Sequence, residues 1–220
     1  MVILRGRTFR VRRDSGRSTL PDVPRRATRT APTVILQGLH GNEPEHWQTW
    51  LAAQLQDAGR EVRYPELPDV NRPGRRAWLD VLRTTLDGLP DGEFDVVCHS
   101  LACLLWLHHV ADGTSSPRPA RVALVAPPSP RSTVPELADF LPVPLLIDEV
   151  RQAAGGTVLA CGTDDPFCPE GAQLAYGLPL RLPTTVVPGG GHLNVAAGYG
   201  PWPPMLDWCG RDKLALLVSR

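Results

Sequence analysis

Short apolar runs alternate with longer segments of helical periodicity from residue 33 onward, and this alternation constrains the fold more than any other feature. The runs cover residues 33–37, 61–64, 94–98, 121–126, 157–161 and 184–187. Most are almost continuously apolar, which is typical of parallel strands covered by helices on both faces, whereas strands with one solvated face alternate apolar and polar residues. The sequence therefore predicts an α/β fold with a mostly parallel sheet assembled from βαβ units.

Helical periodicity lies between these runs and after the last of them. The candidate helices cover residues 46–58, 75–86, 101–111, 170–176 and 205–208. In the first of them the apolar stripe consists of Trp47, Trp50, Leu51 and Leu55, which predicts one face packed on the sheet. Residues 127–156 are rich in proline and only weakly periodic, so we expect a loop or a small cap there rather than a second domain.

Charge divides the chain into two parts, although the formal net charge of the whole is +0. Residues 1–31 contain nine arginines and two aspartates, which leaves 14 basic and 21 acidic residues for 32–220, or net charges of +7 and −7. We interpret residues 1–31 as a disordered N-terminal extension or the product of a start codon placed too far upstream, although the composition also matches an organellar transit peptide. Residues 32–220 are expected to form one domain, whose negative charge disfavours nucleic acid as a partner.

Cysteine content and hydropathy bear on the compartment. The five cysteines are Cys98, Cys103, Cys161, Cys168 and Cys209, an odd number without a CxxC pair, which favours a reducing cytoplasm over a disulfide framework. The chain lacks the ~18 consecutive apolar residues that a transmembrane helix requires. Its N-terminus lacks the roughly 7–15 residue apolar core of a secretory signal. We therefore expect a cytoplasmic protein with no membrane partner.

The junction between the third run and the third helix is the most informative segment for function. It reads Cys98-His99-Ser100-Leu101-Ala102. A serine on a tight strand-to-helix turn exposes its hydroxyl, and the next amide is free at the helix N-terminus. Cys98 and Ala102 stand where the usual G-x-S-x-G pattern has glycine. Ser100 is thus a candidate nucleophile, and an N-cap is the structural alternative.

A serine nucleophile needs a histidine as general base and an acid that orients the histidine. In a strand–serine–helix arrangement of this kind, acid and histidine follow the serine in that order, on loops after later strands. Asp164 and Asp165 follow the run 157–161, and His192 follows the run 184–187. Order and position predict a Ser-His-Asp triad in which either aspartate serves as the acid.

The loop after the first run, Gly38-Leu39-His40-Gly41-Asn42, is the expected source of a second oxyanion donor. We predict that the amides of Leu39 and Leu101 form an oxyanion hole, with the side chain of Asn42 as the alternative donor and a plain turn as the structural alternative. No metal or cofactor is expected. An HExxH pattern is missing, and the glycines at 189–191 precede a histidine rather than a phosphate-binding lysine.

Several motifs together resemble those of one protein family. They are Gly38-Leu39 with His46-Trp47-Gln48, Cys98-His99-Ser100-Leu101, Ala126-Pro127-Pro128, Asp164-Asp165-Pro166-Phe167-Cys168, Gly191-His192-Leu193-Asn194 and Gly198-Tyr199-Gly200-Pro201-Trp202-Pro203. Spread over about residues 33–207, they resemble the small serine hydrolases of the α/β-hydrolase superfamily related to retinoblastoma-binding protein nine and the YdeN-like proteins. The resemblance implies a compact α/β-hydrolase fold with a minimal cap, with Ser100 as nucleophile, His192 as base and Asp165 as acid. Ala102 departs from the glycine of many relatives.

The resemblance leaves the substrate open, because this fold hosts many activities. A short cap suggests a shallow pocket, and we expect Gly38, Pro127 and Trp202 to line it, along with Leu39 and Phe140; core packing is the alternative for the apolar members. The sequence predicts a serine hydrolase that cleaves small carboxylic esters or amides through an acyl-enzyme. The alternative is a catalytically weak or inactive binding protein with the same fold.

Overall fold

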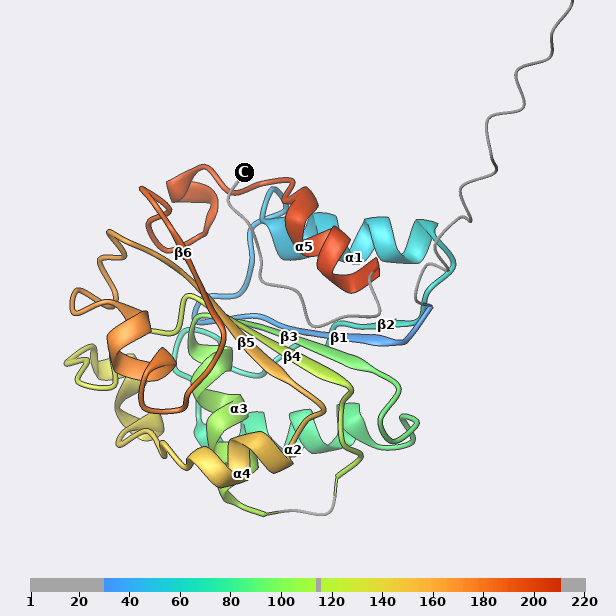
Figure 1. Cartoon of the computed structure of the whole chain (residues 1–220), viewed down its shortest axis with the longest axis horizontal. Coiled ribbons are helices and arrows are strands. Elements are labelled where there is room, and N and C mark those ends of the chain that lie inside the picture. Colours follow the sequence, from blue (N-terminus) through green and yellow to red (C-terminus); the bar gives the residue numbers. More distant parts are fainter. Residues whose placement is uncertain (1–29, 114–115, 211–220) are drawn as a thin grey trace, which may run out of the picture.

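In the computed structural model, which describes residues 30–113 and 116–210, six strands form one sheet in the order β2-β1-β3-β4-β5-β6 (Figure 1). The strands are β1 (Thr33–Leu36), β2 (Val62–Arg63), β3 (Asp95–His99), β4 (Arg121–Val125), β5 (Thr157–Gly162) and β6 (Thr184–Val187). Every neighbouring pair is parallel, which confirms the predicted sheet. Most of the predicted extension, residues 1–29, and the last ten residues of the predicted domain lie outside the described residues.

Helices cover both faces of the sheet (Figure 1). On one face lie α1 (Trp47–Asp57) and α5 (Pro203–Gly210), and on the other lie α2 (Arg75–Leu86), α3 (Leu101–Ala111) and α4 (Ile147–Gln152). Successive residues of a strand point to opposite faces. In β3, Val96 therefore belongs to the core under α2 and α3, whereas Val97 belongs to the core under α1 and α5. Burial on both faces is why the strand sequences are continuously apolar.

The proline-rich segment 127–156 is more ordered than its periodicity predicts. It contains the 3-10 helix η1 (Pro135–Phe140) and then α4, which packs on α3. Phe140 is fully buried, with its ring 5.5 Å from that of Trp78, and its carbonyl accepts a hydrogen bond from His108 Nε2 at 2.9 Å. The expectation that Phe140 lines a pocket is therefore wrong, because its ring anchors η1 to the core.

The chain after β5 carries the remaining short elements. Residues 170–176, predicted as a helix, overlap the π-helical turn η2 (Gln173–Gly177), and the 3-10 turn η3 (Val195–Ala197) precedes α5. No helix among residues 30–113 and 116–210 combines the length and apolar character needed to cross a bilayer.

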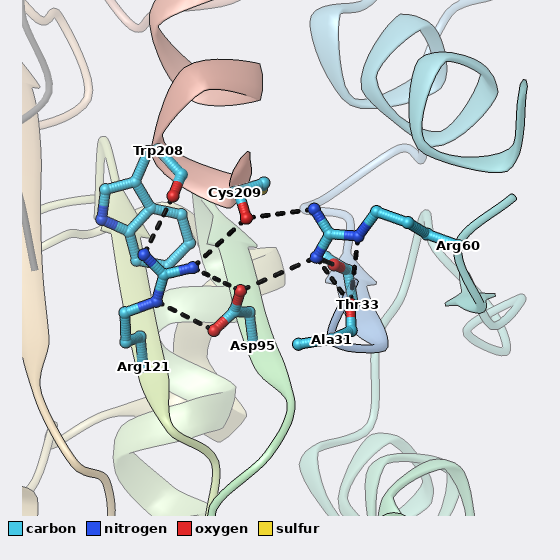
Figure 2. Close-up of polar contacts among 7 residues, drawn as sticks. All are labelled: Ala31, Thr33, Arg60, Asp95, Arg121, Trp208 and Cys209. Carbon is cyan, nitrogen blue, oxygen red and sulfur yellow. Dashed lines mark hydrogen bonds and ion pairs between the residues drawn. The ribbon is translucent and has the colours of Figure 1, made fainter. Parts of the chain in front are cut away.

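A buried ion cluster ties α5 to the amino ends of the strands (Figure 2). Asp95 is completely buried and accepts from Arg121 at 3.0 Å (Nε) and 2.6 Å (Nη2), while Arg60 Nη2 lies 3.9 Å from the same carboxylate. Both arginines also donate to the last carbonyls of α5, those of Trp208 at 2.9 Å and Cys209 at 3.0 Å. These carbonyls form the negative end of the helix dipole. The cluster therefore holds α5 at the sheet edge opposite the carboxyl ends of the strands.

Candidate active site

Three candidate catalytic residues come together at the carboxyl edge of the sheet. Ser100 follows β3, Asp165 lies in the loop after β5, and His192 lies in the loop after β6. Because all the strands are parallel, these loops open at the same edge, which is where α/β sheets bind their ligands. Residues separated by 65 and 27 positions in the sequence are thereby neighbours in space.

A continuous chain of hydrogen bonds joins the three side chains. His192 Nδ1 lies 2.8 Å from Asp165 Oδ2, and His192 Nε2 lies 2.8 Å from Ser100 Oγ. A carboxylate can only accept, so Nδ1 carries the ring proton and Nε2 is free to accept the proton of the serine hydroxyl. Asp165 Oδ1 accepts from the amide of Phe167 at 2.9 Å, and the aspartate is only 3% exposed. This is the arrangement that general-base activation of a serine requires.

The backbone at Ser100 adopts a strained turn. Its φ of 56° and ψ of −125° lie outside the regions that residues with a side chain prefer, a cost of about 1–3 kcal/mol that the surrounding packing must offset. Its amide donates to the carbonyl of Val125 at 2.9 Å, and its hydroxyl bonds to His192 rather than capping α3. Cys98 and Ala102, which replace the usual glycines, are fully buried, and the turn forms with them in place.

Gly38 allows the first loop to approach this turn. A Cβ on Gly38 would lie 2.7 Å from Ser100 Cβ and 3.2 Å from the carbonyl oxygen of His99, so a side chain here would displace the loop or the serine. The approach brings Leu39 to the site. In the part of the chain that the structure describes, neither the Leu39 amide nor the Leu101 amide donates to a protein acceptor, so both are available to a substrate.

The alternative oxyanion donor, Asn42, is occupied by other contacts. Its Nδ2 donates to Gln48 Oε1 at 2.7 Å and also to the hydroxyl of Tyr64. These two bonds use both protons of the amide group. Asn42 thus stabilises the loop around Leu39 and has no remaining proton to donate to an oxyanion.

The structure also separates the two adjacent aspartates. Asp164 Oδ1 accepts from the amide of Gly191 at 2.8 Å and does not contact the ring of His192. A Cβ on Gly162, the last residue of β5, would lie 2.2 Å from the carbonyl oxygen of Gly191, so the end of β5 and the histidine loop touch backbone to backbone. Asp164 therefore joins the two loops, a role that the sequence did not indicate because it depends on contacts between distant segments.

Two further histidines lie beside His192. The rings of His46 and His99 are 4.8 Å apart, and those of His99 and His192 are 5.1 Å apart. Burial lowers the pKa of His46 to about 4, with the neighbouring His192 adding to the effect. Burial also lowers the pKa of His99 well below its usual value, again helped by the adjacent histidines. Both rings are therefore neutral at pH 7 and add no positive charge beside His192.

Comparison with known proteins agrees with this geometry. The sequence profile of the serine hydrolase family matches residues 33–209, which is most of the chain. The chain belongs to the serine hydrolase family. Among curated proteins, none matches this serine hydrolase significantly.

Solved structures share its fold at low sequence identity. The product of the ydeN gene of Bacillus subtilis has a TM-score of 0.70 and 21% identity, with 81% of this chain and 96% of that chain covered. A YdeN-like hydrolase from Pectobacterium atrosepticum has a TM-score of 0.65 and 20% identity over 81% and 88% of the two chains. A thioesterase domain of the curacin biosynthetic pathway has a TM-score of 0.55 and 14% identity over 82% and 91%. These likenesses confirm the α/β-hydrolase fold.

A pocket of about 630 Å³ opens over Ser100 in this hydrolase. Its apolar walls come from Leu39, Pro128, Val134, Leu137, Pro166, Phe167 and Pro169. Gly38 and Leu39 line it as expected, but Pro127 and Trp202 do not. Pro127 is buried, and Trp202 is 1% exposed with its ring edge-on to Trp47 at 5.2 Å. The expectation for both residues is therefore wrong.

Phe167 and the charged groups shape the mouth of the pocket. The Phe167 ring lies 4.5 Å from the ring of His192 and is 49% exposed. Arg131 also lines the pocket, and its guanidinium lies 3.3 Å from Glu170. Among residues 30–113 and 116–210, His, Cys, Asp and Glu side chains form no group of three placed to hold a metal ion.

Proposed function

We propose that this hydrolase cleaves small carboxylic esters or amides through an acyl-enzyme on Ser100. The observation that carries the proposal is the hydrogen-bond chain from Asp165 through His192 to Ser100, with both distances 2.8 Å. An uncharged serine hydroxyl is a poor nucleophile at pH 7, and an adjacent base in the correct tautomer overcomes this. The alignment of all three groups beneath an open pocket supports acyl transfer.

The proposed reaction has two halves. Ser100 Oγ attacks the carbonyl carbon while its proton passes to His192 Nε2, and the Leu39 and Leu101 amides hold the resulting oxyanion. Each such donor typically lowers the barrier by about 3 kcal/mol. The bond to the leaving group then breaks, and the leaving group takes the proton from Nε2. In the second half water attacks the acyl-enzyme by the same route and releases the acid and Ser100.

The pocket supports a small substrate with an apolar leaving group. Its volume of about 630 Å³ is within the range typical of small-molecule sites. Because His192 must protonate the leaving group, that group lies beside its ring, where the half-exposed Phe167 offers an aromatic surface. Aryl esters with short acyl chains are therefore the first substrates to test.

We place the reaction in the cytoplasm, since all five cysteines lie among the described residues, where each is buried and none is bridged.

Labelling with a fluorophosphonate tests the proposal. Intact mass should show a single adduct on the wild type and on Ser132→Ala, which removes another serine of the same pocket, but none on Ser100→Ala. Hydrolysis of short p-nitrophenyl esters should fall by about 10³-fold or more in Ser100→Ala. A folded wild-type protein without an adduct, or a Ser100→Ala variant with undiminished turnover, would contradict the proposal and favour a binding protein with a hydrolase fold.

A further inference from the structure

Two buried side chains donate hydrogen bonds to consecutive carbonyls of the histidine loop. His99 Nε2 lies 3.0 Å from the carbonyl oxygen of His192, and Trp47 Nε1 lies 2.8 Å from the carbonyl oxygen of Leu193. A carbonyl only accepts, so His99 carries its proton on Nε2, and the indole of Trp47 can only donate. The base and the residue after it are therefore held through their backbone from two sides.

The loop that carries His192 needs such support. It follows β6, an edge strand that is only half-buried, and it contains Gly189, Gly190 and Gly191, a residue type with wide conformational freedom. Leu193 has a φ of 49°, which a leucine adopts only when its surroundings impose it. A base that moves by about 1 Å can lose about 100-fold in rate, so the position of this loop matters for turnover.

We propose that His99 and Trp47 are positioning residues that hold His192 in reach of Ser100 by fixing the two carbonyls. The inference rests on the proposed function, since it assigns these residues to the same triad. His99 immediately precedes the nucleophile, so its bond ties the backbone of the base directly to the end of β3. Trp47 is the first residue of α1 and fixes the next carbonyl from the neighbouring element.

The bond of Trp47 is specific rather than a general property of buried tryptophans. Trp47 and Trp202 are both buried and their rings touch edge-on, yet within the described ranges the indole nitrogen of Trp202 has no hydrogen-bond partner. Trp202→Phe therefore removes an indole from the same cluster without removing a bond to the loop. His109, a buried imidazole in α3 outside the pocket over Ser100, provides the corresponding control for His99.

The test compares variants that lose the donor with variants that keep it. His99→Leu and Trp47→Phe should each lower kcat for a p-nitrophenyl ester by about 10-fold. Trp47 lies outside the pocket that His99 helps to line, so KM should change by less than about 2-fold in Trp47→Phe. His99→Gln, which returns an N–H at similar reach, should recover most of the loss. Trp202→Phe and His109→Leu should stay within about 2-fold of the wild type in kcat.

A spectroscopic readout makes the test independent of turnover. The proton on His192 Nδ1, bonded to Asp165, should give a downfield proton resonance, assigned by its absence in Asp165→Ala. It should weaken or shift in His99→Leu and Trp47→Phe and be unchanged in Trp202→Phe. Folded donor-less variants with wild-type kcat and an unchanged resonance would overturn the inference. If Ser100 itself proved unreactive, the proposed function would fail, and the resonance alone would decide whether the two donors hold the loop. If His99→Leu did not fold, Trp47→Phe and His99→Gln would decide whether the donors hold the loop.

Discussion

Acid should destabilise this hydrolase through histidines that folding buries in the neutral form. His109 is 6% exposed in α3, and burial lowers its pKa from 6.5 to about 4, with Arg83 nearby contributing to the shift. The unfolded chain, with a pKa near 6.5, therefore binds a proton at a higher pH than the folded protein. The stabilisation is fully present above about pH 6.5 and is lost as the pH falls toward 4.

The size of the effect follows from the two pKa values. With 6.5 in the unfolded chain and about 4 in the folded protein, the free energy of unfolding loses about 2 kcal/mol per histidine between pH 7.5 and pH 5. His46, whose pKa is also lowered to about 4, adds a similar amount. Together they make up a large fraction of the 5–15 kcal/mol that typically stabilises a domain.

Urea unfolding of the wild type and of His109→Leu at the two pH values isolates this contribution. The substitution changes packing at both pH values, so its packing cost cancels when each protein is compared with itself. The wild type should lose about 2 kcal/mol more than the variant on going from pH 7.5 to pH 5. Equal losses in the two proteins would refute the reasoning, since they would mean that His109 is not held neutral by burial.

Two substitutions test the glycine contact and the ion cluster. Gly38→Ala places a Cβ 2.7 Å from Ser100 Cβ and should lower kcat by about 100-fold. The control is Gly74→Ala, which has open space around its Cβ and should leave kcat unchanged. Equal kcat values for the two variants would show that the loop carrying Gly38 can move aside. Asp95→Asn removes the buried carboxylate that lies 2.6 Å from Arg121 and 3.9 Å from Arg60, and should lower the free energy of unfolding by about 3–5 kcal/mol in thermal or urea denaturation. The exposed pair of Asp80 with Arg83 is the control, because Asp80→Asn should cost less than about 1 kcal/mol, and similar losses would contradict the role of burial.

Local sequence patterns predicted the sheet well but did not distinguish core from pocket. Each predicted strand agrees with the observed one to within one residue at either end, because burial on both faces demands a continuous apolar run. Trp202 and Phe140 were expected in the pocket, yet both rings are buried in the core. An apolar side chain is equally suited to either place, and only the packing of distant elements decides between them. The helix α4 was missed because its six residues are too few to show a period.

The sequence by itself determined which loops carry the candidate triad. Ser100, the aspartate pair and His192 each follow one of the apolar runs, so parallel strands bring them to one edge of the sheet. The order of residues left either aspartate open and the family resemblance implied Asp165, whereas the structure gives the contacts: Asp165 bonds to His192, and Asp164 bonds to the amide of Gly191. The tertiary structure also brought His99 and Trp47 to the carbonyls of the histidine loop. Such contacts join segments up to 146 positions apart, and their directions depend on how the elements pack, which no local pattern records.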